Sequence, residues 1–239
     1  MSEGVRAIDS GSLVDHAVRA VRDHIREHDL KVGDTLPGEG AFADRLGVSR
    51  AVMREAFSTL AALRQIDVGN GRKPRVAAID GSVLSTSFDH AVATAQVTLG
   101  EIWDVRRTLE LRTAELAAIR RSDADARAIV GHAEAMTAHG GDLDALTQHD
   151  IAFHQAIAKA SGNVLLYTII RSFESVMTAE VPAAWRAHSS ADQRAAILDQ
   201  HRRLAQAIAN RDSVAALAEM NTHFDISIAD PFARHSTAI

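Results

Sequence analysis

The sequence predicts a mostly α-helical protein of two domains, with a small β-hairpin in the first and only helices in the second. Three observations lead to this prediction. The chain has 239 residues, more than a single domain usually contains. Its apolar residues, 46% of the total, are mostly Ala, Leu, Val and Ile, whereas aromatic residues make up only 4%. Apolar residues recur at helical spacing from Ser12 onward, and one Asn-Gly pair separates two short β-like runs.

Composition excludes several classes of protein. The chain has no cysteine, so disulfide frameworks and Cys-based zinc sites are excluded. The chain contains no run of about 18 apolar residues, so the sequence predicts no membrane span. The N-terminus lacks the basic-then-apolar pattern of a signal peptide. We therefore expect a cytoplasmic protein with no membrane partner.

The first 77 residues predict three helices followed by a hairpin. Apolar spacing indicates a first helix from Ser12 to about His28. A second begins at Leu36-Pro37-Gly38-Glu39, and a third follows Gly47 and ends near Leu63. Short β-like runs flank the turn Gly69-Asn70-Gly71. Helix, helix-turn-helix and hairpin in this order are the layout of a winged helix-turn-helix domain.

The third helix has two distinct faces. Gly47 and Ser49 provide turn and cap chemistry at its start. Val52, Ala56 and Leu60 recur at four-residue steps on one face, which we expect to pack inward. Arg50 and Arg54, also four residues apart, share another face. A helix of this kind suits entry into a DNA major groove.

Charge is distributed unevenly along the chain. The formal net charge is −5, but residues 45–75 hold seven basic and two acidic side chains, a local balance of +5. The rest of the chain therefore carries −10. A basic patch on an acidic body suits local contact with phosphates.

Leu36-Pro37-Gly38-Glu39, Leu46-Gly47-Val48-Ser49-Arg50 and Arg54-Glu55-Ala56 resemble the DNA-binding domain of GntR-family bacterial transcription regulators. The resemblance implies a dimeric winged-helix regulator whose recognition-helix arginines are Arg50 and Arg54, and whose wing tip enters the minor groove. Gly40 stands where the family usually has arginine, so one expected DNA contact is missing. The predicted DNA-contacting residues are Arg45, Ser49, Arg50, Ala51, Val52, Arg54, Asn70, Gly71 and Arg72.

Residues 78–83 predict a short linker, and residues 84–239 predict about six or seven helices. Helices with short connections favour an antiparallel bundle. The expected breaks lie near Leu99-Gly100, Ser122-Asp123, Gly140-Gly141, Ser161-Gly162-Asn163, Val181-Pro182 to Ser190, and Asn210-Arg211-Asp212-Ser213.

One aspartate and three histidines lie on the inward faces of these helices. Asp150 and His154 are four residues apart, so they share a face with Phe153 and Ile157. His201 and His223 have the same inward spacing on two later helices. We predict that these four side chains bind Zn²⁺, with Ni²⁺ or Mn²⁺ as alternatives. The alternative is that each is a hydrogen-bonded polar residue of the core. His149, rotated by about 100° from Asp150, is expected to face solvent.

The second domain resembles the FCD effector domain of the FadR subfamily. The resemblance rests on Ile102 to Glu110, Asp150-x-x-Phe153-His154, Ala160 to Asn163, His201 and His223. It implies a metal inside a helical bundle that binds a small carboxylate, with Arg106 facing that carboxylate. A guanidinium can bind a carboxylate bidentately.

Together these features predict a ligand-responsive transcription regulator that binds a palindromic operator as a homodimer. Repression relieved by a small organic acid is the preferred mode. Two alternatives remain, a regulator that senses the metal itself and a metalloenzyme with an accessory DNA-binding head. We do not expect the protein to be an enzyme. The candidate general bases, Glu110, Glu115 and Glu134, do not have HExxH-like spacing with the proposed metal ligands.

Overall fold

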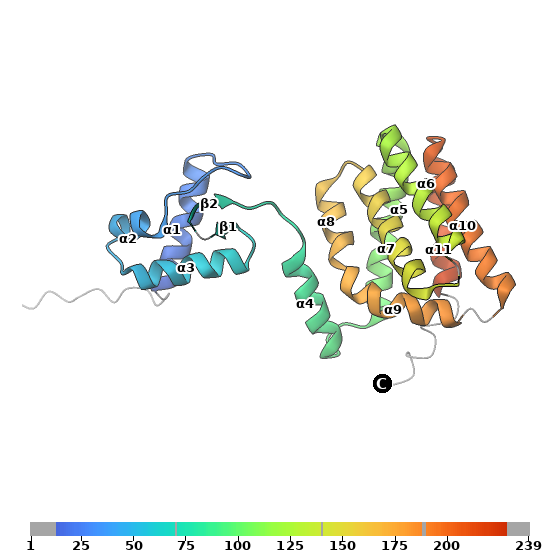
Figure 1. Cartoon of the computed structure of the whole chain (residues 1–239), viewed down its shortest axis with the longest axis horizontal. Helices are drawn as coiled ribbons and strands as arrows, with labels where there is room; N and C mark the ends of the chain where they lie inside the picture. The colour runs from blue at the N-terminus through green and yellow to red at the C-terminus, as the bar shows by residue number, and fades with distance from the viewer. Residues whose placement is uncertain (1–12, 70, 140, 188–189, 229–239) are drawn as a thin grey trace, which may run out of the picture. The chain divides into compact units, whose positions relative to one another are not determined.

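The computed structural model describes residues 13–69, 71–139, 141–187 and 190–228, and the chain divides into two compact units that meet between Val83 and Leu84. Figure 1 labels their helices and strands. Each unit has its own hydrophobic core. None of the helices in these ranges is both long and apolar enough to cross a membrane.

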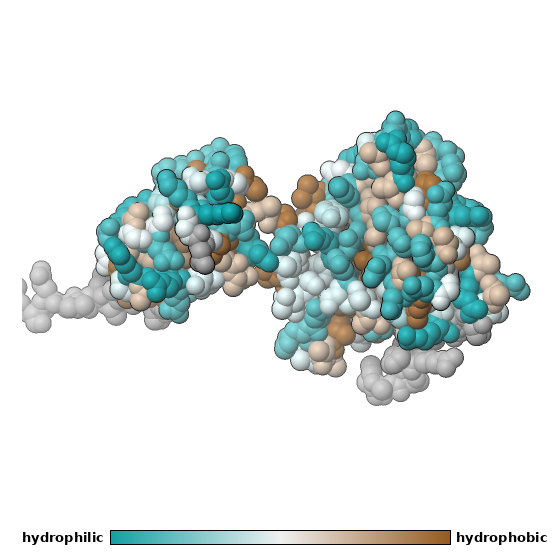
Figure 2. Space-filling view, viewed as in Figure 1, coloured by the Kyte–Doolittle hydropathy of each residue, from teal (hydrophilic) through white to brown (hydrophobic). Residues whose placement is uncertain are grey.

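The N-terminal unit is a winged helix-turn-helix, as the sequence predicts. Its helices are α1 (Leu13–Glu27), α2 (Glu39–Leu46) and α3 (Arg50–Ala62), and its antiparallel strands are β1 (Ile66–Gly69) and β2 (Arg72–Val76). The face of this unit seen in Figure 2 is mainly hydrophilic, with small apolar patches.

The turn between α2 and α3 forms as its residue types require. Gly47 has φ = 67°, a left-handed conformation that glycine adopts without strain. The hydroxyl of Ser49 then accepts a hydrogen bond from the backbone N–H of Val52 at 3.2 Å, which caps α3. α3 packs inward through Met53, Ala56, Phe57 and Leu60, whereas Val52 is only half-buried.

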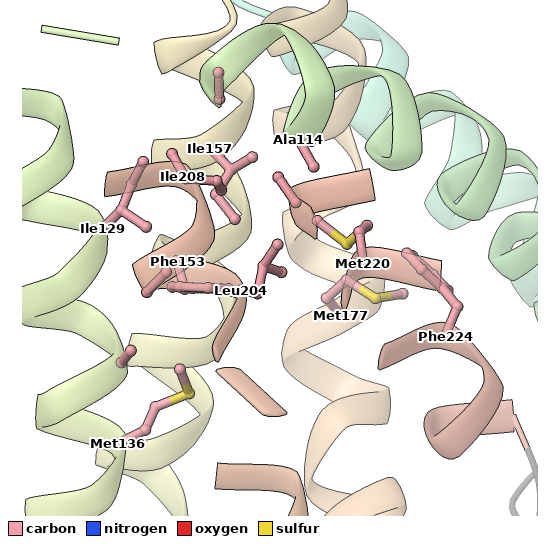
Figure 3. Packing of buried hydrophobic residues seen from close by; sticks show 14 of the residues in the cluster. Ala114, Ile129, Met136, Phe153, Ile157, Met177, Leu204, Ile208, Met220 and Phe224 are labelled. Atoms are coloured by element: carbon pink, nitrogen blue, oxygen red, sulfur yellow. The ribbon is translucent and has the colours of Figure 1, made fainter. Parts of the chain in front are cut away.

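The C-terminal unit is an antiparallel helical bundle. It contains α4 (Ser82–Ala93), α5 (Leu99–Arg120), α6 (Asp123–Ala138), α7 (Leu143–Ala160), α8 (Val164–Ser172), α9 (Glu174–Ala187), α10 (Ala191–Ala209) and α11 (Ser213–Ile228). Side chains from α6, α7, α10 and α11 point toward one another and form the core (Figure 3). Helices α5, α7, α6, α10 and α11 contact one another in that order around it, and α8 and α9 pack against α7.

Side chains of the predicted break residues cap several of these helices. Ser122 and Ser190 form capping boxes with Asp125 and Gln193, and Asn163 caps α8. The break near Leu99 lies just before that residue, where Thr98 and Glu101 form the capping box of α5. α4 begins at Ser82, inside the stretch predicted as a linker.

The predicted break from Val181-Pro182 to Ser190 begins too early. α9 continues through Pro182 to Ala187, and the chain turns earlier, at Phe173. Proline removes one backbone hydrogen bond from a helix but need not end it when packing holds the flanking turns. Val181 and Trp185, on either side of Pro182, are both buried in the core.

Candidate functional site

The exposed face of α3 carries both predicted arginines. Arg50, Ala51 and Arg54 are exposed. The only ion pair that this face makes within the described residues is a weak one, between Arg54 Nε and Glu39 Oε2 at 3.8 Å. Both guanidinium groups are therefore available to an external anion.

The other residues predicted to contact DNA have different local roles. Ser49 uses its hydroxyl to cap α3, and Arg45 places its guanidinium 4.3 Å from the centre of the Phe42 ring. Gly71 has φ = 71°, which favours glycine at this position of the hairpin, and Arg72 is exposed. Asn70 lies outside the described residues.

Gly40 lies in the first turn of α2, and a Cβ built there meets nothing within 4 Å. Space alone therefore does not require glycine at this position. The packing of this unit would allow a larger residue, such as the expected arginine, at position 40.

In the C-terminal unit the structure brings His154 of α7, His201 of α10 and His223 of α11 together. One ring nitrogen from each lies within 4.8 Å of the others, and all three residues are at most 6% exposed. Helices far apart in sequence supply these side chains, because α7, α10 and α11 line the same core. Buried imidazoles this close can hold a metal ion.

Asp150 completes the predicted group. Its Oδ1 lies 3.1 Å from Nε2 of His201, whose Nδ1 lies 2.9 Å from the carbonyl oxygen of Ile197. A carbonyl only accepts, so Nδ1 carries the hydrogen and Nε2 of the neutral ring has a lone pair that faces a carboxylate. Such an arrangement needs either a second proton or a metal cation between the two atoms.

The pKa values of two residues in this cluster favour the protonation states that bind metals. Burial, followed by the charges of His201 and His154, lowers the pKa of His223 well below its usual value. Burial acts to raise the pKa of Asp150. When no metal is bound, a hydrogen bond from doubly protonated His201 and the charges of His154, His201 and Arg106 outweigh burial, so this pKa is lowered. A neutral imidazole and an ionised carboxylate are the forms that bind metals.

Glu110 is a site residue that the sequence analysis did not assign. It is fully buried on α5, and its Oε1 accepts a hydrogen bond of 2.7 Å from Nε of Arg106. Its Oε2 forms an ion-pair contact with Nδ1 of His154, although neither atom has a hydrogen-bond partner. A carboxylate beside Nδ1 leaves Nε2 of His154 as the metal-binding nitrogen. The signal in the sequence was the Arg106–Glu110 spacing of four residues.

Burial favours the protonated form of Glu110, but the charge of Arg106, followed by the contact with His154, outweighs it and lowers the pKa of Glu110 to about 2. A carboxylate with so low a pKa is a poor general base at neutral pH. This weakens the metalloenzyme interpretation for Glu110.

Arg106 itself is 3% exposed and is held on several sides. Its guanidinium carbon lies 4.4 Å from the centre of the Trp103 ring, and one of its Nη atoms contacts the sulfur of Met177. Arg107, in contrast, is partly exposed and joins α5 to α11 through Asp225 at 2.7 Å.

A small cavity of about 10 Å³ adjoins this cluster and is lined by Arg106, Asp150 and His154 together with Gln155, Glu174 and Met177. Nε2 of Gln155 donates to Oε2 of Glu174 at 3.0 Å, which joins α7 to α9 at the exposed side. The cavity can hold little more than a water molecule. A larger ligand therefore requires some of the side chains that line the cavity to move.

Comparison with known proteins matches both units to families. Residues 13–76 match "Bacterial regulatory proteins, gntR family", and residues 101–226 match the FCD domain. The Glc operon transcriptional activator of Escherichia coli K12 is 32% identical over 188 residues, 76% of this chain and 74% of its own length. The putative L-lactate dehydrogenase operon regulatory protein of the same strain is 30% identical over 216 residues, 88% of this chain and 83% of its own length.

A solved GntR structure from Streptococcus agalactiae has a TM-score of 0.66 and 25% sequence identity, and the match covers 89% of this chain and 97% of that one. Regulators of this family bind operator DNA, which agrees with the exposed arginines of α3. The chain is a member of the GntR family of bacterial transcription regulators, with an FCD domain as its C-terminal unit.

Proposed function

We propose that this protein is a homodimeric repressor whose C-terminal unit binds a divalent metal, preferably Zn²⁺, and a small organic monocarboxylate. Asp150, His154, His201 and His223 are the proposed metal ligands, and α3 with the hairpin is the proposed operator-binding surface. Two-fold symmetry then presents two copies of α3 to half-sites of opposite orientation.

The pair formed by Asp150 Oδ1 and His201 Nε2 is the observation that carries the metal proposal. Two atoms that each bind a zinc ion at about 2.1 Å in tetrahedral geometry lie about 3.4 Å apart. Oδ1 and Nε2 are 3.1 Å apart and are both acceptors when the ring is neutral. A cation bound by both atoms removes their repulsion.

The charge of the buried groups supports a monocarboxylate. Arg106 carries one positive charge, Glu110 and Asp150 carry one negative charge each, and ligating histidines are neutral. The balance of −1 becomes +1 with a divalent metal and zero with one bound carboxylate. Uncompensated charge is costly inside a protein, so a monoanion fits better than a dianion.

The name of one relative agrees with this ligand class. It refers to the operon of L-lactate dehydrogenase, and L-lactate is a 2-hydroxy monocarboxylate. A hydroxy acid offers a carboxylate for Arg106 and a hydroxyl that can add to the metal as a fifth ligand.

The test uses the full chain stripped of metal and then loaded with Zn²⁺. A panel of 2-hydroxy monocarboxylates that includes L-lactate is screened by thermal shift, with lactamide as the uncharged control and malate as the dianionic control. We expect at least one monocarboxylate to raise the unfolding temperature of the Zn²⁺-loaded protein only, and to weaken operator binding. Equal shifts with metal-free protein contradict the proposal. A change in DNA affinity on chelation alone, with no acid effect, favours a metal sensor.

A further inference from the structure

A second group of histidines lies between α6 and α7. His132 is on α6, His139 is the residue that caps its C-terminus, and His149 is on α7. The centre of the His149 ring lies 5.7 Å from that of His132 and 5.6 Å from that of His139. The three rings of the buried cluster have centres 4.7, 4.9 and 6.1 Å apart. The two distances from the His149 ring fall within that range. We call His132, His139 and His149 the outer group.

Two nitrogens of the outer group have the separation expected of metal ligands. Nδ1 of His132 and Nδ1 of His149 are 3.4 Å apart. Nitrogens that bind one tetrahedral zinc ion at about 2.0–2.1 Å lie about 3.3–3.4 Å from each other. The two nitrogens, which are also within hydrogen-bond distance, thus have a separation that suits a shared metal ion.

His139 is the third histidine of the group, but in the rotamer of the structure its nitrogens do not converge with those of His132 and His149. Its Nδ1 lies 2.9 Å from the carbonyl oxygen of Ala135, so that nitrogen carries the hydrogen and Nε2 keeps its lone pair. The residue is exposed at the end of α6, where its side chain can change rotamer. Water can supply the fourth ligand.

The surroundings keep these rings accessible. His132 and His149 are half-buried, in contrast to the fully buried inner cluster. Nitrogen ligands without thiolate suit Zn²⁺, Ni²⁺ and Cu²⁺.

We propose that His132 and His149, with His139 as third ligand, form a second divalent-metal site that links α6 to α7. This site is independent of the inner cluster, although His149 directly precedes Asp150 on α7. The two residues point about 100° apart around the helix.

The experiment measures Zn²⁺ bound to the full chain, by elemental analysis and by competition with a chromophoric chelator. The variants are His132→Ala and His149→Gln, each alone and combined with His201→Ala, which removes an inner ligand. His90→Ala, an exposed histidine of α4, is the matched control. Circular dichroism and thermal unfolding verify that each variant is folded.

We expect His132→Ala and His149→Gln to bind about one Zn²⁺ per chain fewer than the wild type and the His90→Ala control. The same difference is expected in the His201→Ala background. Folded His132→Ala with undiminished Zn²⁺ overturns the proposal, as does loss of all Zn²⁺ in folded His201→Ala. If His201→Ala does not fold, the comparison of wild type with His132→Ala alone decides. If instead the proposed inner metal site is wrong, folded His201→Ala binds as much Zn²⁺ as the wild type. That result differs from the two results that overturn the second site.

Discussion

Arg106 and Glu110, four residues apart on α5, form a buried ion pair in which Nε lies 2.7 Å from Oε1. Each residue also contacts a further part of the site, Arg106 through Met177 and Glu110 through His154. The pair thus connects the proposed carboxylate-binding group to a proposed metal ligand.

This geometry predicts that Arg106→Met destabilises the fold and removes acid binding. The change leaves the carboxylate of Glu110 without its arginine, which costs about 3 kcal/mol of the free energy of unfolding. The double variant Arg106→Met/Glu110→Gln should recover most of that loss, because it removes both charges of the pair. Urea denaturation measures the stabilities and calorimetry measures acid binding. Acid binding that survives in the double variant would contradict the role of Arg106.

Substitution of Arg50 or Arg54 by alanine should weaken operator binding roughly 10- to 100-fold, since a good arginine contact to a base contributes about 1–3 kcal/mol. The fold should not change, because both side chains are exposed. Gel shift at fixed salt measures the effect. Arg127→Ala, an exposed arginine on α6, is the control and should bind DNA normally. Unchanged affinity in both α3 variants would refute the assignment of this face.

Gly40→Arg should increase DNA affinity a few-fold and make it more sensitive to salt, because it adds a cation near the proposed DNA surface. A Cβ there meets no atom within 4 Å, and replacing a helical glycine contributes up to about 1 kcal/mol of stability. Gly40→Ala separates the two effects, since it should stabilise the unit without a change in DNA binding. An arginine variant with the salt dependence of wild type would show that α2 lies away from the phosphates.

Removal of metal should lower the unfolding temperature of the protein. At a metal concentration about 100 times the dissociation constant, ligation stabilises the native state by about 2.7 kcal/mol, which corresponds to several degrees. In His154→Ala, EDTA should no longer cause the fall in unfolding temperature that comes from the inner site. In His90→Ala, EDTA should lower the unfolding temperature as it does in the wild type. Differential scanning calorimetry with and without EDTA measures this. An EDTA response of wild-type size in folded His154→Ala would argue against this ligand.

Glu174→Gln should tighten acid binding a few-fold at low salt. The amide oxygen can still accept the hydrogen bond from Gln155, but one negative charge is removed from the edge of the cavity. Glu180→Gln on the same helix controls for the general loss of charge. Titrations at two ionic strengths measure the effect. Equal affinities for wild type and variant would mean that the acid does not enter past Glu174.

The sequence was sufficient to predict local features with a strict residue requirement. Gly47 and Ser49 predicted the turn before α3, and the structure has the left-handed glycine and the serine cap. The four-residue spacing of Asp150 and His154 placed both on the inner face of α7, and inward periodicity did the same for His201 and His223. These features depend on helix geometry alone, which sequence spacing reports directly.

Features that depend on the packing between helices were not predictable in the same way. His149 was expected to face solvent, yet it meets His132 because the register of α6 against α7 brings them together. Glu110 became visible as a site residue only when α5 was packed against α7. Pro182 was expected to end a helix, but buried neighbours on both sides keep α9 continuous.

Pro182 has no N–H to donate to the carbonyl of Thr178, so α9 has one backbone hydrogen bond fewer than a regular helix of its length. This helix also supplies Met177 and Glu174 to the wall of the cavity. One wall of the cavity thus lacks a backbone hydrogen bond, which lowers the free energy of its local opening. If the proposed acid enters on this side, its apparent affinity is the intrinsic affinity multiplied by the fraction of open molecules. A substitution that merely stiffens α9 weakens the response to the acid without contacting it.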